Sequence, residues 1–453
     1  MTSSANPTLG RIQATLKSIS VDSLTSVVFV LVFCDKAITA ALNIVLSRFG
    51  ISSGFVEASL MICIVGLILT HAITSSRALK PYAITVGVIA FVSLCFLITY
   101  ALHPEYGLYY NRPAFGIWDE VYSPLGGCIF AFASVVLCKT GERVYKCLKA
   151  VGWINLLYCL YMSVRASSMG YWESIGATGQ IERLSYNMDI GYLYMSVCIL
   201  FLVRFYVERK PWQLLPMMGS LVAVVAFGSR GALICLFVGL ALVVIAGRPK
   251  KGALLRRIMV LAAICIAGML AYEYFDEILT FAANVFSSIG LDSRTISSLK
   301  TGTIADDNGR SVIANLAMQC IRDGGFFGGG PYADRPYIAP FFYWGYSHNI
   351  VLELIADFGP LLGIAAFVAI GIACVWLFLT ARSNVDMALF IFAFAMSAKL
   401  MVSGTFWGDQ YFWMLIALIF LRTLNARAGC VQSEDDAVLF GSKKAFRRRK
   451  PTL

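Results

Sequence analysis

The chain has 453 residues, of which 58% are hydrophobic and 14% are charged, and its mean hydropathy is +0.74. Soluble domains carry about 25% charged residues, so this composition excludes a soluble globular enzyme. The net charge of +11 would suit a nucleic-acid ligand, but most Lys and Arg residues lie between apolar runs on one side of the predicted topology. That distribution is the positive-inside pattern of membrane proteins, and we expect no nucleic-acid partner.

Apolar segments recur along the whole chain, and a helix needs roughly 20 mostly apolar residues to cross the hydrocarbon layer. We therefore predict an all-α fold, a polytopic membrane helical bundle with about 12 transmembrane helices. Basic and acidic connecting segments alternate, which places both termini in the cytoplasm. We expect the membrane to be a bacterial inner (plasma) membrane. The predicted spans lie near residues 24–47, 54–75, 82–101, 123–138, 149–165, 188–206, 213–228, 231–247, 257–273, 350–380, 386–404 and 409–424.

The domain organisation follows from these spans. A cytoplasmic N-terminal lead (1–23) precedes spans 1–9 (24–273), and a large periplasmic loop (274–346) comes before spans 10–12 (347–424) and a basic cytoplasmic tail (425–453). The spans form one integrated membrane domain rather than separate units.

The large loop is the exceptional segment. Loops of this length inside a compact architecture are usually functional or disordered. Its many aromatic residues argue against disorder, because they can pack on the bundle or lie at the membrane interface. Within it, Ser311–Cys320 has the pattern of a helix and Gly324–Pro331 that of a Gly-rich turn.

Two arginines on the predicted outer side are candidates for binding an anion. Arg230 lies within Gly228–Gly231, between two apolar runs, where a cation must face water, a cavity or an anion. The alternative for Arg230 is a side chain that extends to the interface. Arg310 opens a predicted helix, whose free N–H groups favour a phosphate. The alternative for Arg310 is a salt bridge to Asp306 or Asp307.

Further cations lie in the loop and in a span. Arg322 and Arg335 are candidates, with salt bridges to Asp323 and Asp334 as the alternative. Lys399 falls in the outer third of the eleventh span, where it could join an anion site. Pairing between helices is the alternative for Lys399.

His348 is the candidate for moving a proton. Imidazole is the standard group for this task near neutral pH, and His348 lies at the mouth of a predicted helix with Asn349 beside it. The alternative is a structural histidine. Asp35 and Lys36 are charges within the first predicted span, so each needs a separate partner or a function.

Several motifs are missing from the sequence. It contains no Walker A loop, no HExxH motif and no acidic EF-hand pattern. Gly328–Pro331 lacks the strand and the Lys-Ser/Thr of a phosphate-binding loop. We therefore expect neither ATP-driven transport nor a metal enzyme, and no cofactor.

Three motifs, taken in order, resemble a known family. The run His348-Asn349-x-x-Leu352-x-x-Ile355-x-Asp357-x-Gly359, followed by Gly363, is similar to the signature of the O-antigen ligase and polymerase superfamily of integral membrane glycosyltransferases, which usually has Glu in place of this Asp. Gly309-Arg310 with Gly328–Pro331 resembles the family's GR…GxG segment, and Ser229–Leu233 resembles its SRGALL turn. The first 200 residues match only in hydropathy.

The resemblance implies a metal-independent glycosyltransferase that works on the periplasmic side, with a sugar chain on undecaprenyl pyrophosphate as donor. Carried over to this chain, His348 would be the general base that deprotonates the acceptor hydroxyl. Arg230 and Arg310 would neutralise the pyrophosphate as it leaves. The predicted substrate-binding residues are Asn349, Arg322, Lys399 and Asp357.

Three functions remain open. A polymerase joins the repeat units of O-antigen or another surface polysaccharide, and we favour it. A ligase moves the finished chain onto lipid A–core. A secondary transporter or flippase would use Asp35, Lys36 and Lys399 as a charge relay and would show repeat-related halves, which are not apparent. The expected partners are undecaprenyl-pyrophosphate-linked oligosaccharide, the lipid bilayer, a chain-length regulator and a flippase.

Overall fold

The computed structural model describes residues 21–75, 79–175, 181–184, 187–227, 230–247 and 309–424. Within these ranges the chain is almost entirely helical, and one two-stranded antiparallel sheet pairs β1 (Trp172–Ile175) with β2 (Ile181–Leu184). The predicted span 257–273, residues 274–308 of the loop, and the tail from 425 onward lie outside the described residues.

The helices are described in chain order. They are α2 (Val21–Phe33), α3 (Asp35–Leu46), η1 (Ser47–Phe49), α4 (Ser53–Thr74), α5 (Leu79–Leu102), η2 (Pro104–Tyr106), α6 (Gly107–Tyr110), η3 (Trp118–Tyr122), α7 (Cys128–Leu137), α8 (Gly141–Met169), α9 (Met188–Glu208), η4 (Pro211–Gln213), α10 (Leu214–Phe227), α11 (Arg230–Ala246), α15 (Arg310–Gly324), α16 (Arg335–Ile338), α17 (Ile350–Leu379), α18 (Asn384–Ser397), η6 (Ala398–Met401) and a last helix at Gln410–Leu424. The predicted helix and Gly-rich turn of the loop are both present, as α15 and the turn that follows it.

The prediction of an α-helical membrane protein is confirmed in its coarse form. Among the described residues, six helices are long and apolar enough to cross a membrane, or seven if the bent pair α2–α3 counts as one span. Other predicted spans correspond to shorter helices, such as the 10 residues of α7 and the 14 of α10. The total of about 12 spans and the periplasmic position of the loop stay predictions.

The first predicted span is not one continuous helix. It breaks after Cys34 into α2 and α3, whose axes differ in direction by 84°. The break coincides with the two charges of this span, because Asp35 and Lys36 form the first turn of α3. An acidic residue at a helix N-terminus is favourable, and the bend lets Lys36 reach α9.

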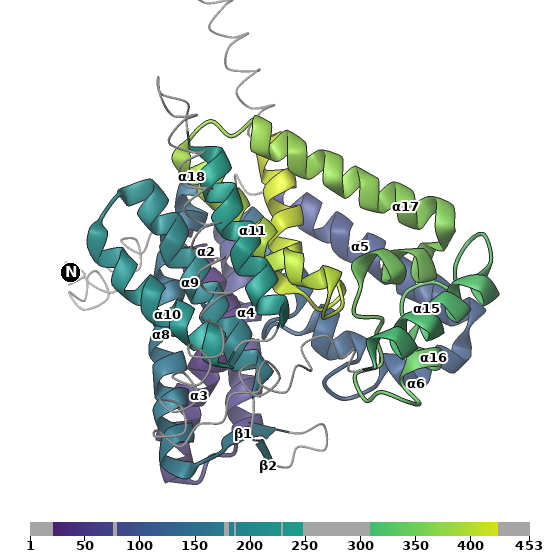
Figure 1. The fold of residues 1–453 in the computed structure, drawn as a ribbon, viewed down its shortest axis with the longest axis horizontal. Helices are drawn as coiled ribbons and strands as arrows, with labels where there is room; N and C mark the ends of the chain where they lie inside the picture. Colours follow the sequence, from purple (N-terminus) through teal and green to yellow (C-terminus); the bar gives the residue numbers. More distant parts are fainter. Residues whose placement is uncertain are drawn as a thin grey trace, which may run out of the picture.

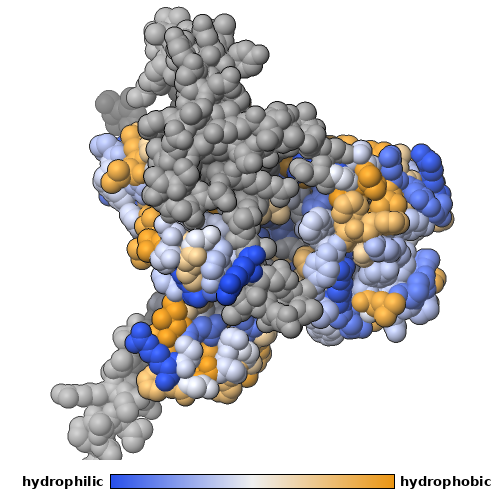
Figure 2. Space-filling model, turned by 60° about the horizontal axis from the view of Figure 1, so that its bottom comes forward, coloured by the Kyte–Doolittle hydropathy of each residue, from blue (hydrophilic) through white to orange (hydrophobic). Residues whose placement is uncertain are grey.

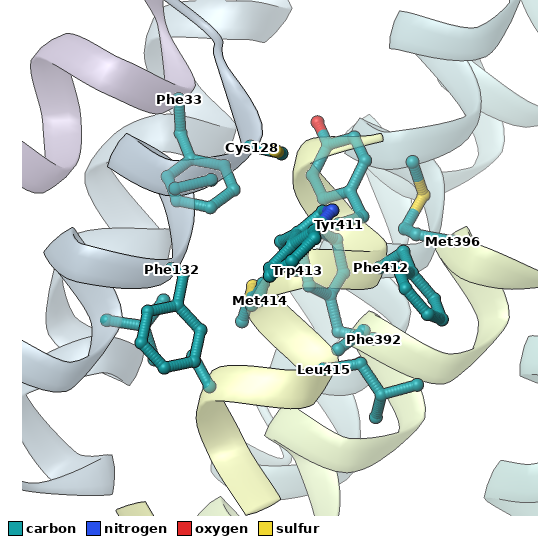
Figure 3. Packing of buried hydrophobic residues seen from close by; sticks show 14 of the residues in the cluster. Phe33, Cys128, Phe132, Phe392, Met396, Tyr411, Phe412, Trp413, Met414 and Leu415 are labelled. Carbon is teal, nitrogen blue, oxygen red and sulfur yellow. The ribbon is translucent and has the colours of Figure 1, made fainter. Parts of the chain in front are cut away.

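Helix α9 lies in the middle of the bundle and contacts α8, α10, α11 and α18. Aromatic side chains fill the space beside it, where Phe132 of α7 meets Trp413 edge to face and Tyr411 lies between Phe33 and Phe392 (Figure 3). Interlocking aromatic rings of this kind fix neighbouring helices in one register. Elsewhere, α15, α16 and α6 gather at one end of α17 (Figure 1). The end that carries β1 and β2 shows strongly hydrophilic residues next to hydrophobic patches (Figure 2).

Helix α17 has a kink at Gly359, and the Gly-rich turn (Gly324–Pro331) packs against it. Gly359 has φ 79° and ψ 166° inside α17 and precedes Pro360, a conformation open essentially to glycine alone. The backbone of the turn runs directly along this kink, and a Cβ on Gly359 would lie 2.0 Å from the carbonyl oxygen of Phe326. The N–H groups of Gly329 and Gly330 donate to carbonyl oxygens of α17. The glycines therefore bring the loop and α17 together.

Candidate functional site

His348 lies in the loop between α16 and α17, next to the turn that follows η6. The Gly404 N–H donates to His348 Nδ1 over 3.3 Å. The imidazole ring meets the rings of Tyr346 and Trp344 edge to face, at centroid distances of 4.5 and 5.9 Å. The backbone of His348 has φ 53°, an uncommon value for a residue other than glycine. Such strain persists only where the surroundings fix it, and it is frequent at functional sites.

The surroundings keep this histidine neutral. Burial, together with the positive charges of Arg310 and Arg335, lowers the pKa of His348 to about 4. Because Nδ1 accepts from Gly404, the neutral ring carries its proton on Nε2. To act as a base through Nε2, the ring must carry its proton on Nδ1 instead. Nδ1 could then no longer accept from Gly404, so this long contact must first be lost.

Arg335 forms the centre of a buried charge network, which we term the Arg335 cluster: Arg335, Asp334, Glu120, Glu353 and Tyr332. The guanidinium lies 2.8 Å from Asp334, 3.5 Å from Glu353 and 3.8 Å from Glu120, and its own side chain is 2% exposed. Its carbon atom stands 4.3 Å from the centre of the Tyr332 ring, and the Tyr332 hydroxyl donates to Glu120. The predicted salt bridge to Asp334 is present, but it is only one part of this network.

The Arg335 cluster forms hydrogen bonds with the residue before His348 and with the turn that contacts the imidazole. Asp334 accepts the N–H of Ser347, the residue before His348, over 2.8 Å. Glu353 accepts the Thr405 hydroxyl and, over 3.1 Å, the Phe406 N–H. Thr405 directly follows Gly404, the donor to His348. The charges of the cluster thus position the imidazole and its hydrogen-bond donor together.

Asn349 and Asp357 have positioning contacts. The Asn349 side chain caps α17 by accepting two N–H groups, at 2.9 and 3.2 Å, and donates to the Met401 carbonyl of η6. Asp357 is 1% exposed and accepts from Trp407 Nε1 over 2.7 Å and from the Ala333 N–H over 3.3 Å. Both residues tie α17 to its neighbours, so they orient the region around His348.

The predicted cations are not all brought together. Arg310 opens α15 close enough to lower the pKa of His348, and in the described part of the chain no carboxylate pairs with it. Asp306 and Asp307, its predicted alternative partners, lie outside that part. Arg322 is exposed at the far end of α15, about 18 Å along the helix axis from Arg310. Asp323 does not pair with Arg322 but accepts the hydroxyl of Tyr337.

Lys399 and the start of α11 lie beside the turn that contacts His348. Lys399 Nζ is 2.6 Å from Asp409 and stands over the Tyr192 ring at 5.3 Å. Arg230 is the first residue of α11, although its side chain lies outside the described part. A Cβ on the next residue, Gly231, would come 2.2 Å from the Tyr192 hydroxyl and 3.3 Å from a methyl group of Val402. The glycine after Arg230 thus allows α11 to begin against this turn.

Two of the predicted intramembrane charges have partners. Lys36 pairs with Asp189 and Lys399 with Asp409, as the interhelix alternative predicted. In the described ranges, no three His, Cys, Asp or Glu side chains come together as a group that could hold a metal ion.

Sequence reasoning did not single out Glu120, Glu353, Thr405 or Gly404. One signal for Glu353 was available, because it is an ionisable residue inside an apolar run and lies one helical turn before Asp357. The other three belong to turns and short helices that only the fold brings near His348.

These features define an α-helical membrane protein with a neutral histidine beside a buried charge network and an arginine, Arg310, that has no carboxylate partner among the described residues. The profile of the O-antigen ligase family matches residues 215–365. The chain therefore carries, over this segment, a domain of the O-antigen ligase and polymerase superfamily, as its motifs predicted. A comparison with curated proteins found no match. The matched segment contains His348, Arg230 and Arg310, while Lys399 lies beyond it.

Proposed function

We propose that this chain is a glycosyltransferase of the periplasmic side of the bacterial inner membrane. It polymerises oligosaccharide repeat units of O-antigen or another surface polysaccharide, which are carried on undecaprenyl pyrophosphate. The match to the O-antigen ligase family and the spanning helices support a lipid-linked sugar substrate. A flippase that delivers this substrate and a chain-length regulator are the partners that the function implies.

The transfer needs one group to take a proton and another to receive negative charge. An acceptor hydroxyl gives its proton to His348 as its oxygen forms a bond to the anomeric carbon of the donor sugar. The bond from that carbon to the pyrophosphate oxygen breaks, and undecaprenyl pyrophosphate leaves with the bonding electrons. The neutral imidazole can take the proton once the ring has released its contact with Gly404, and this contact is weak because it is long, at 3.3 Å.

The position of Arg310 near His348 is the observation on which the proposal mainly rests. The positive charge of Arg310 lowers the pKa of His348, whereas two other cations of this region, Arg335 and Lys399, have carboxylate partners. An arginine at a helix N-terminus, without an acidic partner among the described residues, is suited to bind a pyrophosphate in two-pronged hydrogen bonds. Arg230, at the start of α11, is the second proposed pyrophosphate ligand. Arg322 and Lys399 are proposed to contact more distant parts of the substrate.

A ligase is the second candidate, because the description of the matching family is O-antigen ligase. It uses the same proton transfer and the same leaving group, but the acceptor is lipid A–core. The two functions therefore differ in the acceptor that reaches His348 and not in the chemistry around it.

Deletion of the gene separates these functions. We would compare the lipopolysaccharide ladder and the undecaprenyl-linked sugars of the deletion strain with those of its parent. Core carrying a single repeat indicates a polymerase, whereas bare core with long polymer on the lipid carrier indicates a ligase. Unchanged lipopolysaccharide and unchanged lipid-linked sugars would refute both. Complementation with His348→Ala or Arg310→Ala should fail at normal protein levels, while Lys149→Met, far from the site, should restore the ladder.

A further inference from the structure

A solvent-exposed ion pair between α3 and α9, which we term the open ion pair, has no part in the transfer steps described above. Lys36 Nζ lies 2.7 Å from Asp189 Oδ2, and the two side chains are 58% and 66% exposed. Charges within a membrane bundle are costly unless they face partners, water or a ligand. The pair satisfies its two charges mutually, yet it leaves most of its polar atoms uncovered.

Charged and polar groups from other elements face this pair. Asp189 also experiences the positive charge of Lys399 from η6. Tyr346 experiences the negative charge of Asp189, and its ring lies against His348. The pair therefore lies near Lys399 and near Tyr346, whose ring contacts His348.

The side chains of the other ion pairs around His348 are much less exposed. The side chains of Lys399 and Asp409 are 21% and 2% exposed, and those of the Arg335 cluster are 10% exposed or less. Among the ion pairs that the structure describes in this region, the Lys36–Asp189 pair thus has the polar atoms available to a ligand.

The helix break creates the pair and is built into the fold. Because α2 and α3 bend by 84°, Lys36 stands in the first turn of α3 and reaches the first turn of α9. The neighbouring Asp35 fits against Gly126, where an added Cβ would lie 2.9 Å from its Oδ2 atom. Gly126 itself has φ 76°, so a larger residue there would be strained as well as crowded.

The chemistry of an open ion pair favours a neutral polyol. A sugar hydroxyl can donate to the carboxylate and a neighbouring one can accept from the ammonium, without breaking the pair. A pyrophosphate would instead be repelled by Asp189 and would compete with it for Lys36. Arg310, which no carboxylate of the described residues pairs with, is therefore the better site for the anion, and the Lys36–Asp189 pair the better site for the sugar.

We propose that Lys36 and Asp189 form a subsite that binds the hydroxyl groups of the acceptor sugar and places it beside His348. The inference rests on the proposed function and adds to it the residues that recognise the acceptor. Tyr346, whose ring lies against His348 and which experiences the charge of Asp189, supplies an aromatic ring on which a sugar can stack. These residues determine acceptor affinity, while Arg310 determines donor affinity.

The test uses the full chain in nanodiscs with two substrates. The donor is the undecaprenyl-pyrophosphate-linked repeat unit, and the acceptor is the same oligosaccharide freed from its lipid, which cannot itself be a donor. In Asp189→Asn and Lys36→Met we expect the acceptor KM to rise on the order of tenfold, since each loses a charge-assisted hydrogen bond. The donor KM, and binding of sugar-free undecaprenyl pyrophosphate, should stay unchanged.

The control is Lys149→Met, which removes an ion pair between α8 and α9 (3.3 Å to Glu208) at the opposite end of α9, about 28 Å from Asp189 along the axis. Its KM values should equal those of the unaltered protein. An unchanged acceptor KM in Asp189→Asn, or equal losses for both substrates, would overturn the inference, because equal losses indicate a structural role. If the unaltered protein transfers nothing to the free repeat unit but transfers to lipid A–core oligosaccharide, the polymerase proposal fails, and the same comparison is made with that acceptor.

Discussion

Arg335→Met tests whether the Arg335 cluster positions the site. In the described part of the chain, no other Lys, Arg or His lies within 4.0 Å of Asp334, Glu353 or Glu120. Methionine keeps much of the side-chain volume but leaves three buried carboxyl groups without a cation. Breaking a buried pair in this way costs about 3–5 kcal/mol. We expect the lower end of this range, because the carboxyl groups can take up protons.

The expected loss of about 3 kcal/mol corresponds to a fall of roughly 6–12 °C in unfolding temperature, at 2–4 °C per kcal/mol. Turnover should fall on the order of a hundredfold, because a shift of about 1 Å in a catalytic group costs this much. Both quantities can be measured on protein in nanodiscs, by thermal unfolding and by transfer of labelled repeat units. The double variant Arg335→Met with Glu353→Gln should regain about 1–2 kcal/mol, since removing both partners costs less than removing one.

The matched control is Arg165→Met, which removes an arginine that is 41% exposed and pairs with Glu173. Exposed pairs contribute about 0–1 kcal/mol, so its unfolding temperature should change little. If Arg335→Met unfolds within about 2 °C of the unaltered protein and transfers sugar normally, the cluster neither stabilises the fold nor positions His348, and the reasoning is refuted.

Three further predictions concern the kink, one carboxyl group and the histidine. Gly359→Ala should destabilise the protein by about 3 kcal/mol or more, because the new Cβ would lie 2.0 Å from a backbone oxygen and the residue has φ 79°. The control is Gly371→Ala in the same helix, where a Cβ meets nothing within 4 Å; in thermal unfolding it should be neutral or stabilising. Burial raises the pKa of Glu120 from 4.5 to about 7, so the folded state binds a proton more tightly than the unfolded state and loses stability as pH rises from 4.5 to 7. Glu120→Gln, which mimics the protonated acid, should therefore stabilise the protein by about 3 kcal/mol at pH 8 and hardly at all at pH 5, and equal effects at both pH values would contradict this. Transfer should be lost only as pH falls through about 4, the lowered pKa of His348; a midpoint near 6.5 would show that the histidine is not held neutral. In Arg310→Gln, which should transfer little sugar, the pKa of His348 followed by NMR should lie higher, because a nearby cation is removed.

The sequence by itself determined the class of protein and much of the local structure around the site. Apolar runs are a property of each segment alone, so composition and hydropathy suffice to predict membrane helices. The start of α15 at Arg310 and the cap of α17 at Asn349 are also local, since capping depends on a few adjacent residues. The ordered motifs of residues 228–363 were enough to predict the family that the profile confirmed over residues 215–365.

Only the tertiary structure decided which charges meet. The Arg335 cluster joins η3, α16 and α17, and the contact of His348 with Gly404 joins residues 56 positions apart. The 84° bend after Cys34 turned a predicted span into two helices and gave Lys36 a partner 153 residues away. No local pattern encodes such pairs, because a buried charge is stable with any opposite charge that packing brings within reach. The sequence thus determines that these charges need partners, and the packing of the helices selects them.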